Sequence, residues 1–190
     1  MRVPLPDTWR ETGKLLVVAG AFGGLALAVV AAKLTLEIPG TGVVTDPREL
    51  FTTTGAAFTG PVGAVVIGVL AGTLEPDIPK ASLLAHVAGG LWMGFAYKKL
   101  VYERMRMPAV LAGWAVLVFA YYYVFVIPGF VAGQAVFYPA VYDEGYGAGT
   151  SWISAYWTLG RGAFPEALLT SVVTTLAFTA LPRRMRRPLW

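Results

Sequence analysis

Long blocks of apolar residues divide the chain, and their lengths match helices that cross a membrane. Roughly 20 apolar residues in a helix span the ~30 Å hydrocarbon layer of a bilayer. Four such blocks are clear, at about 14–36, 80–102, 108–136 and 164–181. A fifth, at 49–74, is interrupted by Gly60 and Pro61, and a Gly-Pro pair commonly kinks a helix.

The distribution of basic residues decides how the fifth block is interpreted. Lysine and arginine collect on the cytoplasmic side of membrane proteins. Five crossings would place the basic clusters on opposite faces, whereas a 49–74 segment that enters and returns, turning at Gly60-Pro61, places them all inside. The alternative is one kinked helix. The clusters are Arg2, Arg10 and Lys14, then Lys98, Lys99, Arg104 and Arg106, and finally Arg183, Arg184, Arg186 and Arg187.

We therefore predict an all-α integral membrane protein, a six-helix bundle whose short or re-entrant second and third segments are broken at Gly60-Pro61. Residues 1–190 form one polytopic domain in the cell membrane, with both termini cytoplasmic. A turn inside the bilayer must be covered by protein, because unpaired backbone groups in lipid cost several kcal/mol each. The glycines of 55–72 allow close helix packing, and the threonines of 52–59 can hydrogen bond freed carbonyls.

Composition supports the membrane assignment and narrows the chemistry. Hydrophobic residues make up 56% of the 190 residues, charged residues only 14%, and the mean hydropathy is +0.62, which is too apolar for an ordinary soluble domain. There is no cysteine and one histidine, so we expect no metal and no cofactor. No catalytic constellation or phosphate-binding loop is present, which argues against an enzyme. The basic C-terminus favours anionic lipid over nucleic acid.

Some polar and aromatic residues are candidates for contacting a ligand at the outer side. His86 lies within a predicted span, where an ionisable group faces the interior or a cavity, so it is either a satisfied core histidine or a ligand contact. Segment 137–163 is rich in tyrosine, tryptophan and glycine, which fits an interfacial aromatic belt or a hinged lid over a ligand. Arg161 and Glu166 follow this segment and are candidates for contacting a charged part of such a ligand. Of the three consecutive tyrosines 121–123, only one or two can line any cavity.

The first helix carries a stripe of small residues at four-residue spacing. A stripe of this kind lets another helix approach closely. The helix that packs on this stripe belongs either to a separate subunit or to this chain. The stripe consists of Gly20, Gly24, Ala28 and Ala32.

The stretch IPGTGVVTDPRELFTTTGAAFTGPVGAVVIGVLAG, from Ile38 to Gly72, resembles the substrate-binding S components of energy-coupling-factor (ECF) vitamin transporters. In that family an outer loop and a short second helix precede a Gly-Pro-x-x-Gly segment that opens the third. Chain length and layout also agree. Sensor modules of some bacterial histidine kinases have a similar GPxxGxxxG pattern, and the rod-shape protein family shares the six-helix layout.

The resemblance implies a protein that captures a vitamin-like small molecule from outside and works with a membrane coupling subunit and a pair of ATPases. The stripe on the first helix would then face the coupling subunit. An outward-opening pocket would hold His86, Gln134, Tyr138, Trp152, Trp157 and Arg161. The alternatives are an accessory or scaffold subunit of a larger membrane complex and a membrane sensor module.

Overall fold

The computed structural model of the chain describes residues 9–38, 40, 43–75, 77–103, 109–182 and 186–190. Nearly all of its regular structure is helical, and the two short strands form one antiparallel pair with Leu36 opposite Thr45. The elements are α1 (Trp9–Ala31), β1 (Leu36–Ile38), β2 (Val43–Thr45), α2 (Arg48–Gly72), α3 (Pro79–Ala96), the π-helical η1 (Tyr97–Tyr102), α4 (Ala109–Ala120), the π-helical η2 (Tyr121–Val126), α5 (Ile127–Phe137), α6 (Pro139–Tyr146) and α7 (Trp152–Ala180).

Length and hydropathy mark the chain as a helical membrane protein. Within the described residues, four helical stretches are long and apolar enough to cross a bilayer by length and composition alone, and one of them, α2, is interrupted at Gly60. Large apolar side chains such as Val17, Val116 and Leu176 are more than half exposed, as expected where lipid replaces water. The four stretches are Glu11–Ala31, Arg48–Gly72, Ala109–Phe137 and Trp152–Ala180.

The α2 segment is a helical hairpin rather than a straight rod. The backbone of Gly60 leaves helical geometry with φ 68° and ψ −168°, and Pro61 cannot continue the hydrogen-bond ladder across the break. Arg48 Nη1 lies 3.3 Å from the carbonyl oxygen of Ala71, although a straight helix would separate these residues by about 35 Å. The chain therefore turns back at Gly60-Pro61, as predicted, and the alternative of one kinked helix does not fit.

Glycines allow the second arm of this hairpin, 61–72, to lie directly against α3. A Cβ on Gly68 would lie 2.8 Å from the Cα of Val87, and one on Gly94 would lie 2.7 Å from the carbonyl carbon of Gly60. The first arm is also tight, because a Cβ on Gly55 would meet Phe22 of α1 at 2.6 Å. Close backbone approach is the usual means of helix association in lipid.

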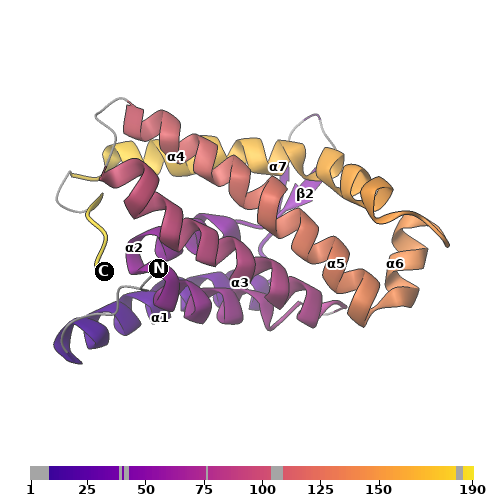
Figure 1. The fold of residues 1–190 in the computed structure, drawn as a ribbon, viewed down its shortest axis with the longest axis horizontal. Helices are drawn as coiled ribbons and strands as arrows, with labels where there is room; N and C mark the ends of the chain where they lie inside the picture. The colour runs from indigo at the N-terminus through magenta and orange to yellow at the C-terminus, as the bar shows by residue number, and fades with distance from the viewer. Residues whose placement is uncertain (1–8, 39, 41–42, 76, 104–108, 183–185) are drawn as a thin grey trace.

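The reversal in α2 gives the bundle two distinct ends. We call the end with β1, β2 and Arg48 the β-hairpin end, and the end with Gly60 and Gly94 the tail end. Figure 1 shows α4, η2 and α5 as one long rod beside α7, with α6 beyond α5 and the C-terminus at the opposite end.

Residues 186–190 cover the turn of the hairpin at the tail end. The backbone N–H of Leu189 donates to the carbonyl oxygen of Phe58 at 2.8 Å, an acceptor that the break in α2 deprives of its helical partner. The indole of Trp190 lies over Gly60, with the Lys98 ammonium 4.5 Å from its ring centroid. The turn is thus covered by protein, as the sequence argument requires.

The described basic residues of all three predicted clusters gather at the tail end. Tyr97, next to Lys98, donates to the carbonyl oxygen of Arg186 at 2.7 Å. Lys14 lies in α1 beyond Ala19, whose Cβ is close to Gly63. The remaining members, Arg2, Arg104, Arg106, Arg183 and Arg184, lie outside the described residues.

The structure corrects the last span and the segment before it. The predicted start near 164 is wrong, because α7 already begins at Trp152, after Ser151 accepts a hydrogen bond from the N–H of Ser154 at 3.3 Å. Pro165 lies inside α7 instead of opening it. Segment 137–163 is accordingly mostly helical, being occupied by α6 and the first turns of α7, and not one long hinged loop.

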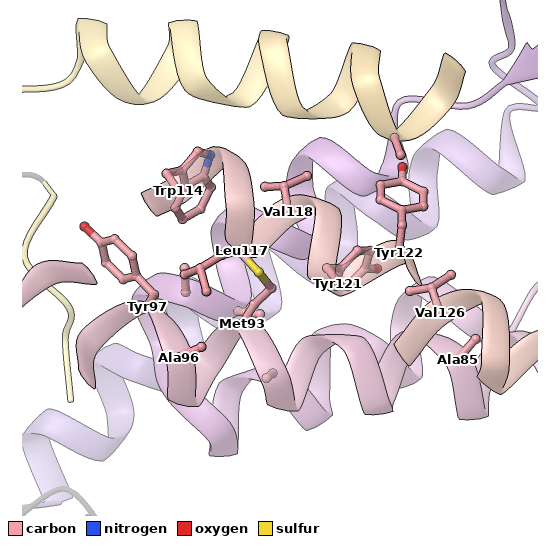
Figure 2. Packing of buried hydrophobic residues seen from close by; sticks show 14 of the residues in the cluster. Ala85, Met93, Ala96, Tyr97, Trp114, Leu117, Val118, Tyr121, Tyr122 and Val126 are labelled. Atoms are coloured by element: carbon pink, nitrogen blue, oxygen red, sulfur yellow. The ribbon is translucent and has the colours of Figure 1, made fainter. Parts of the chain in front are cut away.

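An aromatic core holds η1, α4 and α7 together near the tail end. Trp114 stacks on Phe178 with 4.8 Å between ring centroids, and Tyr97 meets Trp114 edge to face at 5.4 Å. The Trp114 indole N–H donates to Thr174 Oγ1 at 3.1 Å, so its polar atom is satisfied in the interior. Figure 2 shows this cluster continuing along the bundle to Tyr121 and Tyr122.

Candidate functional site

A buried carboxylate, Glu49, organises the interior toward the β-hairpin end. It is 4% exposed. Its Oε2 accepts hydrogen bonds from the hydroxyls of Thr52, at 2.6 Å, and Tyr121, and its Oε1 lies 2.8 Å from His86 Nε2. These partners come from three separate segments, α2, α3 and η2, so the group ties the hairpin to its neighbours.

The bonding of His86 fixes the charge of the pair. Its Nδ1 lies 2.6 Å from the carbonyl oxygen of Ser82, which can only accept, so Nδ1 carries a proton. A carboxylate facing a bare Nε2 at 2.8 Å would repel it, so a second proton lies between Nε2 and Glu49 Oε1. Whichever of the two atoms holds that proton, Glu49 and His86 are neutral as a unit. His86 is thus satisfied on both nitrogens, and it also lines the cavity described below.

A second ionic group joins the two arms of the α2 hairpin at the end opposite Gly60. Arg48 Nε lies 2.9 Å from Asp46 Oδ2, and Arg48 Nη1 lies 2.8 Å from Glu75 Oε2, just past the second arm. Asp46 also accepts from the backbone N–H of Arg48 at 2.9 Å. Burial raises the pKa of the Asp46 carboxyl, although the neighbouring Arg48 opposes this shift.

A third polar group comes from η2 and α7. The Tyr122 hydroxyl donates to Glu166 Oε1 at 3.1 Å and lies 3.0 Å from Thr170 Oγ1. Figure 2 shows Tyr122 reaching toward α7. Tyr121 instead contacts Glu49, and Tyr123 donates to the Gly160 carbonyl at 2.9 Å, so the three consecutive tyrosines diverge as predicted.

These three groups meet around a cavity of about 230 Å³. Exposed Thr35 in its wall places the opening at the β-hairpin end, beside the strand pair. Part of its wall is polar and ionic, and part is apolar. The lining residues are Thr35, Thr45, Asp46, Arg48, Glu49, His86, Tyr122, Val126, Ile127, Phe130, Leu159, Ala163 and Glu166.

The six residues predicted to bind substrate do not converge on this cavity. His86 lines it, and the other five do not. Gln134 has a buried side-chain oxygen without a hydrogen-bond partner in the described part of the chain. The Tyr138 hydroxyl accepts from the backbone N–H of Lys80 at 3.1 Å, which places Tyr138 at the start of α3.

The other three predicted residues lie on the outer surface of α7. Trp152 is about half exposed and stacks on Tyr156. Trp157 and Arg161 face sideways, into an open, largely apolar groove of about 520 Å³ on the flank of the bundle. That groove is lined by Phe119, Tyr123, Trp157, Gly160, Arg161 and Phe164.

The small-residue stripe of α1 faces outward. Gly20, Gly24, Ala28 and Ala32 are all exposed, and a Cβ on either glycine would meet nothing within 4 Å. The interior face of α1 is a different one, with buried Leu15, Ala19, Ala26 and Val29. Among the described residues, no helix of this chain packs on the stripe, so the prediction of contact within the chain is wrong for them.

Sequence reasoning missed the ionic side of the cavity wall, apart from His86 and Glu166. Glu49 and Arg48 lie at the edge of an apolar block, and neither was among the predicted site residues. One signal was available: a histidine inside a predicted span needs a partner, and the reversal at Gly60-Pro61 brings the chain that follows it, including His86, back to the side where Glu49 begins the block. No family model matches the chain, and neither curated proteins nor solved structures show significant similarity to it.

Proposed function

We propose that this protein is a substrate-binding membrane protein that takes a small molecule from the outer face into the cavity between β2, α3, η2 and α7. The observation that carries the proposal is the cavity itself, which combines ionic and apolar walls and opens at one end of a membrane bundle. Binding sites for small molecules usually pair an apolar lining with a few placed polar groups. Ionisable groups inside membrane proteins generally mark such pathways or sites.

The proposed arrangement in the cell membrane has six membrane segments. α1, the two arms of α2, α3 with η1, the α4–η2–α5 rod and α7 would alternate in direction, with the tail end in the cytoplasm. The gathering of Lys14, Lys98, Arg186 and their neighbours at one end supports this orientation, because basic residues are retained on the cytoplasmic side. The cavity then opens outward.

The more specific form of the proposal is an S component of an ECF-type transporter for a vitamin-like micronutrient. Its support is the resemblance of 38–72, in which Gly60-Pro61-Val62-Gly63 opens the second arm of the α2 hairpin, one residue shorter than the Gly-Pro-x-x-Gly spacing of that family. The exposed stripe Gly20, Gly24, Ala28 and Ala32 supplies a surface on which a membrane coupling subunit can pack. An ATPase pair would act through that subunit, since we find no nucleotide-binding motif in this chain.

The test is mass spectrometry of small molecules released from gently purified protein. Ala163 lines the cavity and Ala180 is exposed on the same helix, so Ala163→Phe fills the cavity while Ala180→Phe is its matched control. We expect one compound to be retained by the parent and by Ala180→Phe, and to be lost from Ala163→Phe. Retention by Ala163→Phe, or a parent that carries nothing and is stabilised by no member of a vitamin mixture, contradicts the proposal.

An accessory subunit of a larger membrane complex is the second candidate, because an exposed small-residue face on α1 serves any helical partner. Its distinguishing result is co-purification with other subunits by a protein that holds no small molecule. In that case Gly24→Leu, which fills the stripe, should release the partner, and Ala163→Phe should not.

A further inference from the structure

The charges around the cavity do not balance, and the imbalance indicates what the ligand carries. Arg48 is shared by two carboxylates, Asp46 and Glu75. Glu49 and His86 are neutral as a unit, because the Nδ1 proton is committed to Ser82. These two groups together therefore contribute one net negative charge.

Glu166 adds a carboxyl group on the α7 side, and a cation beside it would stabilise its ionised form. It lines the cavity and is partly buried. The hydroxyl of Tyr122 donates to it, and no lysine, arginine or histidine of the described residues lies within ion-pair distance of it. A carboxylate in such a site is costly unless a cation or several donors compensate it.

Part of the cavity wall is apolar and comes from η2, α5 and α7. It consists of Val126, Ile127, Phe130, Leu159 and Ala163, and Phe130 meets the His86 ring edge to face at 5.7 Å. A bare metal ion would gain nothing from these side chains, whereas the hydrocarbon part of an organic molecule would be desolvated by them. The volume of about 230 Å³ equals roughly eight waters at about 30 Å³ each, which suits a small single-ring compound.

We propose that the ligand is a small organic cation whose positive group lies against Glu166 and whose apolar body lies against the wall formed by η2, α5 and α7. This rests on the proposed function, because it assigns the ligand of the same cavity. Arg48 is already neutralised by two carboxylates, so it does not select for an anion here.

The first measurement is the charge of whatever compound the unmodified protein releases, and it needs no variant. We expect a compound that is positively charged at pH 7. A released compound that is neutral or anionic overturns this inference and leaves the proposed function intact. If nothing is released and no probe below binds, both fail together.

The second measurement uses three probes built on one ring: the cation 1-methylnicotinamide, neutral nicotinamide and anionic nicotinate. Thermal stabilisation of the purified protein by each reports binding, and we expect the cation to bind at least about tenfold more tightly than the anion. Glu166→Gln should abolish that preference for the probes and lower retention of the released compound about tenfold. Glu144→Gln, on exposed α6, should change neither.

A preference for nicotinate, or a cation preference that survives Glu166→Gln, overturns the assignment. If Glu166→Gln does not fold, Glu166→Asp keeps the charge but withdraws it by one methylene, and it should keep the preference for the cation with weaker binding. Loss of the preference in Glu166→Asp also counts against the inference.

Discussion

Replacing Glu49 with alanine tests the buried cluster most directly. The change removes the acceptor of three donors, on Thr52, Tyr121 and His86. Each unsatisfied buried donor costs about 1–3 kcal/mol, but the three share one acceptor and are not additive. Breaking a buried pair by removing one partner costs about 3–5 kcal/mol, which we take as the total for Glu49→Ala.

For a chain of this size, 1 kcal/mol corresponds to a change in Tm of about 2–4 °C, so Glu49→Ala should lower Tm by about 6–20 °C. Glu49→Gln should lower Tm much less, because the glutamine amide can donate to Nε2 of a neutral His86 and still accept from Thr52 and Tyr121. The assay is thermal unfolding of detergent-purified protein, with exposed Glu144→Ala as the control. A Glu49→Ala protein within about 2 °C of the parent, or a Glu49→Gln protein that loses as much as Glu49→Ala, refutes the reasoning.

Two further predictions test the reversal in α2 and its orientation. Gly60→Ala places a side chain on a residue with positive φ, beneath an indole ring, and should lower the free energy of unfolding by about 1–3 kcal/mol, measured by thermal unfolding. The control Gly162→Ala lies in open helix and should be neutral or stabilising by up to about 1 kcal/mol. Equal effects of the two changes would count against the hairpin. Because the chain has no cysteine, single cysteines at Gly13, Glu37 and Arg187 can be labelled without background. An impermeant maleimide should reach the Glu37 position on intact cells and the other two only after permeabilisation, and labelling of the Gly13 and Arg187 positions from opposite faces would exclude six crossings.

The reversal could be predicted because it determines on which side of the membrane every later basic cluster lies. A Gly-Pro pair alone is ambiguous, but the basic residues before 14 and after 183 require an even number of crossings. The close packing of α2 on α3 could also be anticipated, since glycines at 68 and 72 have few other uses within a membrane helix.

The cavity could not be predicted in the same way, because its wall is assembled from residues far apart in sequence. Glu49 and His86 meet only after the hairpin, α3 and η2 have taken their places. The start of α7 was missed for a local reason: Pro165 is typical of a helix start, and the aromatic residues before it are equally common at membrane interfaces. Trp157 and Arg161 were then predicted to share a pocket with His86, whereas α7 directs them into the separate groove on the flank of the bundle.

The hydrogen bond from Leu189 to Phe58 has a consequence for biosynthesis. The ribosome delivers residues from the N-terminus onward, so the bend at Gly60 enters the bilayer well before the segment that covers it has been made. During that interval the Phe58 carbonyl must find another donor, such as water drawn into the bundle or an insertion factor. Assembly of this protein therefore includes a late docking step at the tail end, and pulse-chase proteolysis should show a nascent intermediate that is cut near residue 60 until 186–190 have been added.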